Sequence, residues 1–152
     1  MKYQQVYLIL DNIRSAYNVG SIFRTADGAG VTKIYLCGIT PTPNVKTFGV
    51  GADPKIAKTA LGAEKTMPWE YHKQIGRLLN KLRGDGLWFV ALEQTKSSKN
   101  IFSYKPPRNR SIALIVGNEV KGVSKKILSY ADKIIEIPMR GKKESLNVAV
   151  AT

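Results

Sequence analysis

The sequence predicts an α/β fold, a mostly parallel sheet with helices on both of its faces. Short apolar runs alternate along the chain with segments whose apolar residues recur every three or four positions. This alternation is typical of β-α-β units. The run at 87–92 is continuously apolar, like a strand buried on both faces. At 152 residues, the chain has the length of a single domain.

The chain begins with an apolar strand at residues 6–10, followed by a helix. Asn18 is predicted to be the N-cap of that helix, because Asn is favoured at this position. Gly28 and Gly30 are predicted to end the helix. Its apolar face consists of Val19, Ile22, Phe23 and Ala26.

The rest of the first half holds weaker signals. Pro41 and Pro43 favour a loop, and the helix predicted before Gly84 has leucines at helical spacing. The predicted elements are a strand at 33–37, a loop at 38–51, a short helix capped by Asp53, a short strand at 66–69 and a helix at 71–83.

In the second half, strands are separated by loops and short helices. Residues 94–110 are polar and basic and contain two adjacent prolines, which predicts a loop. The predicted elements are strands at 87–92, 111–116 and 133–137, a helix from Ser124 to Tyr130, and a final helix that begins at Ser145.

The charge balance indicates an anionic partner. The chain has 24 Lys and Arg residues against 11 Asp and Glu residues, a net charge of +13. Such a surplus favours nucleic acid. A membrane surface is the weaker alternative, because no basic helix carries a broad apolar face. We find neither a signal peptide pattern nor an apolar run of the ~20 residues that span a bilayer, so we expect a cytoplasmic protein.

Cysteine and histidine usage excludes several kinds of site. Cys37 is the only cysteine and His72 the only histidine. An internal disulfide and a Cys/His zinc site are therefore impossible, and we expect no metal. His72 is predicted to lie on the surface at a helix start. The chain also lacks both G-x-G-x-x-G and the P-loop motif, which argues against an ordinary dinucleotide site and an NTPase.

Three polar clusters follow predicted strands at separate places in the chain. Because ligands bind outside the carboxyl ends of parallel strands, these clusters can converge on one site. Each residue also has a purely structural interpretation: Arg24 can pair with Asp27, and Glu119 can be an ordinary loop carboxylate. Asn147 is less ordinary, because it stands early in the predicted final helix, where Asn has a poor propensity.

Taken together, the clusters resemble the three motifs of the SpoU (TrmH-like) branch of the SPOUT RNA methyltransferases. The matching segments are NVGSIFRTADGAG, LIVGNEVKGVS and IPMRGKKESLNVAVA, in that order. The resemblance implies a deep trefoil knot at the C-terminus and a homodimer whose site receives an Arg from the partner. It also implies S-adenosyl-L-methionine as cofactor. The residues implied to bind it are Leu92, Glu93, Gln94, Val116, Gly117, Asn118, Glu119, Gly122, Ile137, Pro138, Met139, Ser145, Leu146 and Asn147.

The resemblance also implies the reaction, methyl transfer to a ribose 2′-hydroxyl of tRNA or rRNA. The residues that match the family's catalytic positions are Asn18, Arg24, Glu119, Ser145 and Asn147. Arg24 is a poor base, since guanidinium stays protonated far above neutral pH, so we interpret it as a charge clamp for the developing alkoxide. A phosphate oxygen or a water then takes the proton.

RNA is the expected partner, and basic residues surround the second and third motifs. With Arg24, they are Lys121, Lys125, Lys126, Arg140, Lys142 and Lys143. We expect residues 1–152 to be one methyltransferase domain without a separate RNA-binding domain, its final helix cut short at Thr152. The alternative function is a catalytically silent RNA-binding protein on the same fold.

Overall fold

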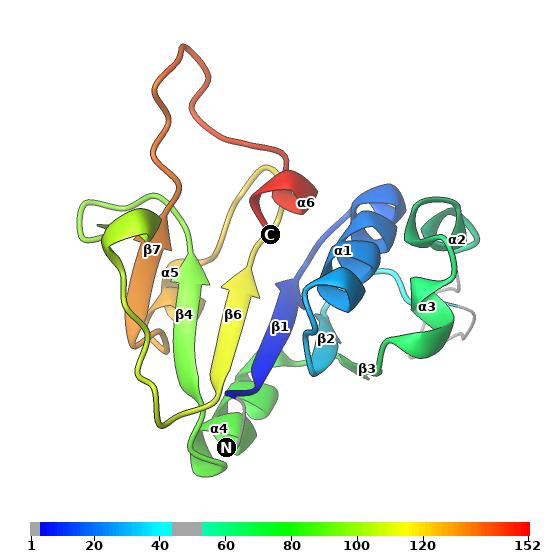
Figure 1. Cartoon of the computed structure of the whole chain (residues 1–152), viewed down its shortest axis with the longest axis horizontal. Coiled ribbons are helices and arrows are strands. Elements are labelled where there is room, and N and C mark those ends of the chain that lie inside the picture. The colour runs from blue at the N-terminus through cyan, green and yellow to red at the C-terminus, as the bar shows by residue number, and fades with distance from the viewer. Residues whose placement is uncertain (1–3, 44–52) are drawn as a thin grey trace.

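A computed structural model describes residues 4–43 and 53–152, and its centre is a seven-stranded sheet (Figure 1). The strand order is β3-β2-β1-β6-β4-β7-β5, and every pairing between these strands is parallel. The strands are β1 (Val6–Asp11), β2 (Lys33–Cys37), β3 (Trp69–His72), β4 (Trp88–Leu92), β5 (Lys99–Asn100), β6 (Ile112–Val116) and β7 (Lys133–Glu136).

Helices pack on both faces of the sheet, as the sequence predicted (Figure 1). They are α1 (Ala16–Gly28), α2 (Lys55–Ala60), α3 (Ala63–Thr66), α4 (Ile75–Gly84), α5 (Lys125–Leu128) and α6 (Val148–Ala151), with a 3-10 turn η1 (Ile101–Ser103). None of the helices in the described ranges is long and apolar enough to cross a bilayer.

Side chains of β1 alternate between two hydrophobic cores, because successive residues of a strand point to opposite faces. Leu8 and Leu10 belong to the core under α1, α2 and α3. Ile9 belongs to the core under α4 and α5. Each of the three is 3% exposed or less, so the centre of the sheet is covered on both sides.

The start of α1 differs from the prediction that Asn18 is its N-cap. The cap is Ser15, whose hydroxyl oxygen accepts from the backbone N–H of Asn18 at 3.2 Å. Ser and Asn are equally good caps, so propensity could not distinguish them. Because the helix begins three residues earlier than predicted, Asn18 lies in its first turn and its side chain is available for other contacts.

Gly20 allows α1 and α2 to approach closely. A Cβ at this position would collide with the Thr59 side chain and with the carbonyl oxygen of Ile56. The Thr59 hydroxyl in turn donates to the carbonyl oxygen of Tyr17 at 2.8 Å. Asp53, predicted to cap α2, is not its N-cap: the cap position is Pro54, and the Asp53 carboxylate just before it accepts from the N–H of Lys55 at 2.9 Å.

Residues 66–74 are the main error in the predicted elements. The predicted strand at 66–69 is displaced to β3, and the helix predicted from residue 71 begins at Ile75. Parallel pairing with β2 explains the shift, since Ile34 lies opposite Trp69 and Cys37 opposite His72. The prediction of a surface histidine at a helix start is therefore wrong: His72 lies in a strand, partly buried against the ring of Tyr35.

Three further boundaries differ from the predictions. The segment 94–110 is not only loop, because it contains β5 and η1, and β5 extends the sheet beyond β7. Ser124 caps α5 as predicted, but the helix ends at Leu128. The final helix begins at Val148, not at Ser145. Of the predicted loop at 38–51, residues 44–51 lie outside the described residues.

Candidate functional site

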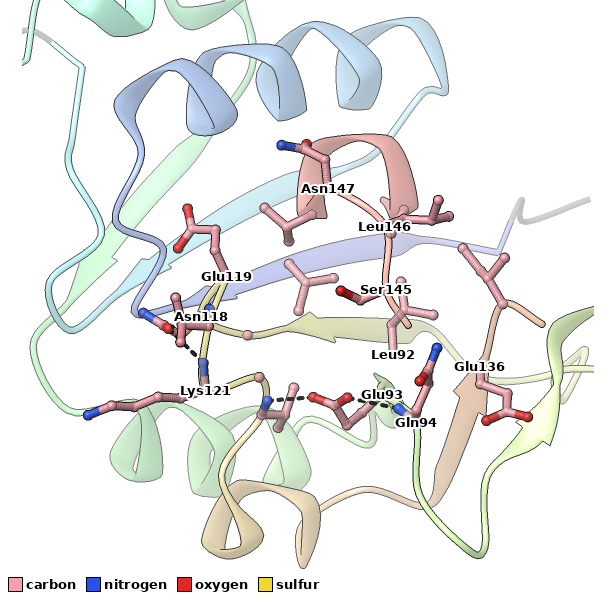
Figure 2. Close-up of a pocket in the computed structure, with 18 of the residues that line it drawn as sticks. Leu92, Glu93, Gln94, Asn118, Glu119, Lys121, Glu136, Ser145, Leu146 and Asn147 are labelled. Atoms are coloured by element: carbon pink, nitrogen blue, oxygen red, sulfur yellow. Dashed lines mark hydrogen bonds between the residues drawn. The ribbon is translucent and has the colours of Figure 1, made fainter. Parts of the chain in front are cut away.

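A cavity of about 350 Å³ lies where β4, β6 and β7 end (Figure 2). These strands are neighbours in the sheet, so their carboxyl-terminal residues Leu92, Val116 and Glu136 meet at one edge. All residues predicted to bind a cofactor line this cavity except Pro138. The convergence of separate loops at this edge is the arrangement expected for a ligand site in an open parallel sheet.

Sequence reasoning missed several residues of the wall. Some of these residues are neighbours in the sequence of predicted residues, and that position could have indicated them. Glu136 and the residues of α6 have no sequence pattern that marks them as part of a site. The lining residues outside the predicted cofactor set are Val120, Lys121, Val123, Glu136, Val148 and Ala151.

Asn118 shapes the loop between β6 and α5 from within. Its side-chain oxygen accepts from the backbone N–H groups of Val120 and Lys121, both at 2.9 Å. Its carbonyl oxygen accepts from the N–H of Gly122 at 2.8 Å, and its amide donates to the carbonyl oxygen of Asn12 at 2.9 Å. A short Asn chain that bonds its own backbone is a common way to fix a tight turn.

Glu93 ties this loop to the end of β4. One carboxylate oxygen accepts from the N–H of Val123 and the other from the N–H of Gln94, each at 2.8 Å (Figure 2). Gly122 has a φ of +66° and lies so close that a Cβ would collide with the Glu93 carboxylate. Only glycine meets both conditions without strain. Gly117 faces the backbone of Gly122 just as closely, so any side chain there would disrupt the loop.

The carboxylate of Glu119 joins the second motif to the first. It accepts from the N–H groups of Arg14 and Ser15 at 2.9 and 3.0 Å and from the side-chain amide of Asn18 at 3.1 Å. Desolvation by burial alone would raise the pKa of Glu119, but these hydrogen bonds outweigh it and lower the pKa below its usual value. Glu119 is therefore an ionised anchor for the start of α1.

Asn147 extends the same chain of contacts to the third motif. Its amide donates to the side-chain oxygen of Asn18 at 3.1 Å, and its own side-chain oxygen accepts from the N–H of Ala149 at 2.9 Å. Asn147 is thus the N-cap of α6, a position where Asn is preferred. The cap position explains why an Asn, which has poor helix propensity, stands where a helix was predicted to begin. The hydrogen bond to Asn18 also links Glu119, Asn18 and Asn147, one residue from each motif.

The remaining predicted catalytic residues occupy different places. Ser145 lines the cavity, whereas Arg24 does not. Arg24 is exposed on α1 and, within the described part of the chain, forms no ion pair with Asp27. It lies seven residues after the exposed Tyr17, so both occupy one stripe of the helix. Asn18, which contacts the other two motifs, faces about 120° away from that stripe.

The predicted RNA-binding residues are all exposed but do not form one cluster. Lys121 lines the cavity, and Arg140, Lys142 and Lys143 belong to the loop that leads from β7 to α6. Lys125 and Lys126 begin α5, which packs on the opposite face of the sheet from α1 (Figure 1). The basic residues thus surround the carboxyl edge of the sheet from two sides.

The cavity itself is locally acidic although the whole chain is basic. Three carboxylates, those of Glu93, Glu119 and Glu136, line it, against one ammonium group, that of Lys121. Much of the remaining wall is apolar, with Leu92 and Val116 among its residues. Such a cavity suits a ligand that combines a flat or aliphatic body with positive charge.

The sequence model of the SpoU rRNA Methylase family matches residues 5–152. The chain belongs to this family. It is 32% identical over 145 residues to the 23S rRNA (guanosine-2′-O-)-methyltransferase RlmB of Pseudomonas putida, which covers 95% of this chain and 54% of the relative. The corresponding protein of Shewanella oneidensis is 33% identical, with the same coverage. The chain therefore spans about half the length of these SpoU relatives.

Solved structures of RNA-modifying enzymes share the fold. A TrmH/SpoU tRNA modifying enzyme of A. aeolicus superposes with a TM-score of 0.80 at 30% identity, over 99% of this chain and 71% of that one. An AdoMet-bound rRNA methyltransferase of Sinorhizobium meliloti superposes with a TM-score of 0.82 at 25% identity, over 99% of this chain and 53% of that one. These similarities confirm the predicted α/β fold and the predicted family.

Proposed function

We propose that this protein transfers a methyl group from S-adenosyl-L-methionine to a ribose 2′-hydroxyl of tRNA or rRNA. One observation carries the proposal: the loops of the second and third SpoU motifs enclose a single cavity together with the end of β4, and Asn18 of the first motif joins them through the Glu119–Asn18–Asn147 chain of hydrogen bonds. The relatives named above act on rRNA or modify tRNA, which supports this substrate class.

The cavity has the chemistry that this cofactor requires. S-adenosyl-L-methionine supplies a methyl group on a positively charged sulfur, which is a good leaving group. Leu92, Val116 and Leu146 offer apolar surface for an adenine ring, and backbone groups of the 117–122 loop offer polar contacts to its edge. The carboxylates of Glu93 and Glu136 favour the cationic part of the ligand through the local field. The volume of about 350 Å³ lies within the range typical of small-molecule sites.

We propose that Arg24 acts on the ribose rather than on the cofactor. Its guanidinium stays protonated, so it cannot accept the proton, but it stabilises the negative charge that develops on the 2′-oxygen and holds the adjacent phosphate. In this proposal Ser145, which lines the cavity, orients the hydroxyl, and Asn18 and Glu119 hold the loops together through their hydrogen bond. Alignment of this kind contributes roughly 7–11 kcal/mol to lowering a barrier.

The position of Arg24 supports a homodimer in which each site receives Arg24 from the partner subunit. Within one chain it lies outside the cavity, about one and a half helical turns beyond Asn18. Apolar side chains around the cavity and on the same stripe of α1 remain unusually exposed: Tyr17 by 45%, Val120 by 82%, Leu146 by 41% and Val150 by 72%. A second copy that covers them would bring two α1 helices together.

We also propose that residues 1–152 act as one domain in the cytoplasm and that its C-terminal segment forms a deep trefoil knot. After β7, the chain crosses the carboxyl ends of β4 and β6 and reaches α6 beside α1 (Figure 1). The crossing supports a knot, because the segment passes over strands that precede it in the chain. It also explains why residues 136–148 can close the cavity.

Two measurements test the function and separate it from a catalytically silent RNA-binding protein. Calorimetry with S-adenosyl-L-methionine measures whether the cavity binds the cofactor. Mapping of 2′-O-methyl groups in total cellular RNA, with and without the gene, identifies the modified nucleotide. Binding of RNA without binding of the cofactor and without a lost methyl group would support the silent alternative and overturn the proposal.

A further inference from the structure

Phe102 is a large apolar side chain left almost entirely in water. It is 82% exposed and lies in η1, directly after the outermost strand β5. Exposure costs such a ring roughly 1.5–3 kcal/mol relative to burial. Single exposed apolar residues are common, so exposure alone assigns no role. The surroundings of Phe102 are what distinguish it.

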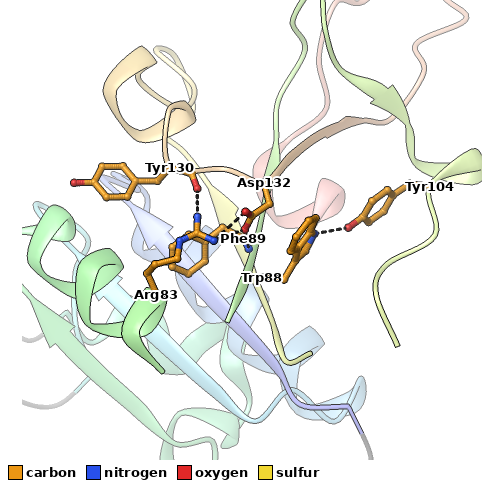
Figure 3. A network of polar contacts seen from close by, with 6 residues as sticks. All are labelled: Arg83, Trp88, Phe89, Tyr104, Tyr130 and Asp132. Carbon is orange, nitrogen blue, oxygen red and sulfur yellow. Dashed lines mark hydrogen bonds and ion pairs between the residues drawn. The ribbon is translucent and has the colours of Figure 1, made fainter. Parts of the chain in front are cut away.

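The backbone on both sides of Phe102 is anchored. Before it, the side-chain oxygen of Asn100 accepts from the N–H of Phe102 at 2.9 Å, and the hydroxyl of Ser103 donates to the carbonyl oxygen of Asn100 at 2.9 Å. After it, the backbone N–H of Tyr104 donates to the carbonyl oxygen of Ile101 at 3.2 Å, and the Tyr104 hydroxyl accepts from the indole N–H of Trp88 at 3.0 Å (Figure 3). The turn therefore presents the ring to solvent from a fixed position.

This position is next to the cavity. In the pairing of β5 with β7, Asn100 lies opposite Glu136, whose side chain lines the cavity. The hydroxyl of Ser98 donates to the same carboxylate at 2.7 Å. Because the two strands are parallel, the turn after β5 emerges at the same edge of the sheet. Two residues of chain and one strand spacing place the Cα of Phe102 within about 12 Å of that of Glu136.

The segment around Phe102 is basic throughout. Residues 94–110 contain five Lys or Arg residues and no Asp or Glu residue. Lys99 and Lys105, three residues away on either side, are both exposed, and the Arg110 guanidinium lies 5.4 Å from the centre of the Trp88 ring. A protein partner would require a contiguous apolar patch. An exposed aromatic ring among cations is instead the composition of surfaces that stack single-stranded nucleic acid.

We propose that Phe102 is a stacking platform for an unpaired base of the substrate RNA, close to the nucleotide whose ribose enters the cavity. Lys99 and Lys105 bind the phosphates on either side of that base. This inference rests on the proposed function, since it names a subsite for the same RNA. It also names the class of substrate: RNA that is single-stranded beside the modified nucleotide, such as a loop, rather than a continuous duplex.

The test compares four variants of the whole chain. Phe102→Ala removes the ring, Phe102→Leu keeps apolar bulk without a π face, and Phe102→Trp keeps the π face. Leu61→Ala is the matched control, because Leu61 is 66% exposed and lies beside α2, on the other side of the molecule from β5. The probe is an oligoadenylate of about ten nucleotides, a usual length for such surfaces, in which one adenine is replaced by fluorescent 2-aminopurine.

We expect Phe102→Ala and Phe102→Leu to bind the oligoadenylate about tenfold more weakly and to lose the quenching of 2-aminopurine that accompanies stacking. Phe102→Trp and Leu61→Ala should bind and quench like the unchanged protein. Affinity for S-adenosyl-L-methionine should be the same in all variants, because Phe102 does not line the cavity.

Three results would overturn the inference while leaving the proposed function intact. They are unchanged oligoadenylate binding by Phe102→Ala, full affinity of Phe102→Leu, and a shift of Phe102→Ala to a smaller species in size-exclusion chromatography, which would make Phe102 a contact between subunits. A fourth result would overturn the proposed function and support the platform. In that result the protein binds the oligoadenylate through Phe102 but binds no S-adenosyl-L-methionine.

Discussion

Replacement of Asn147 by Ala tests whether the chain of hydrogen bonds between the motifs organises the cavity. The change removes two interactions at once, the cap on the N–H of Ala149 and the hydrogen bond to Asn18. Loss of an Asn cap costs about 1 kcal/mol. The amide–amide bond is exposed, so its net contribution is at the low end of the usual range, about 0.5 kcal/mol.

The sum of about 1.5 kcal/mol converts into affinity only if ordering of α6 is coupled to ligand binding. The structure supports coupling, because Val148 and Ala151 of α6 line the cavity together with Asn147. We therefore expect Asn147→Ala to weaken binding of S-adenosyl-L-methionine about tenfold, measured by calorimetry. Helix content should change little, since α6 spans only Val148–Ala151.

Two further variants separate the cap from the bond to Asn18. Asn147→Ser keeps a capping oxygen but loses the amide donor, so it should weaken binding only about two- to threefold. Asn18→Ala removes the same bond from the other side together with the bond to Glu119, so the combined effect of Asn18→Ala and Asn147→Ala should be smaller than the sum of the two. A dissociation constant for Asn147→Ala within about twofold of the unchanged protein would refute the reasoning and remove Asn147 from the site.

Three other changes address charge. Because the folded-state pKa of Glu119 is lowered, its stabilising contribution is present above the usual glutamate pKa and is lost as pH falls through the lowered value. Glu119→Gln should therefore flatten the acid limb of the stability curve in chemical unfolding, and an unchanged limb would contradict the anchoring role. Arg24→Ala should leave cofactor affinity intact and abolish methyl transfer, and mixing it with Asn147→Ala should restore part of the activity in mixed dimers. Failure of that rescue after confirmed subunit exchange would indicate a site built within one chain. Lys142→Glu with Lys143→Glu should weaken binding of all RNAs alike and reduce the salt slope of log affinity by about 1–2. An unchanged slope would show that RNA docks elsewhere, whereas cofactor affinity should stay the same.

The sequence by itself indicated the class of fold and, through its resemblance to the SpoU family, most of the residues that surround the cavity. Short apolar runs and period-3.6 patterns are local, so they predicted the strands that carry the site and the helices on both faces of the sheet. Since parallel strands end at a common edge, the loops after residues 92, 116 and 137 were expected at one edge of the sheet, and the strand order β6-β4-β7 makes them neighbours. Most residues that line the cavity were named from the family resemblance, whereas Val120, Val123, Glu136, Val148 and Ala151 were not.

Only the tertiary structure decided the roles of particular side chains. Ser15 and Asn18 are equivalent N-caps by propensity. In the structure Asn18 binds Glu119, 101 residues away, and Ser15 is the N-cap of α1. His72 lies in a strand because its segment pairs with β2, a pairing between distant segments that the sequence did not indicate. Asn147, which local propensity made anomalous, is the cap of α6 and the partner of Asn18. Each of these outcomes depends on hydrogen bonds between residues distant in the chain, which local periodicity and propensity do not encode.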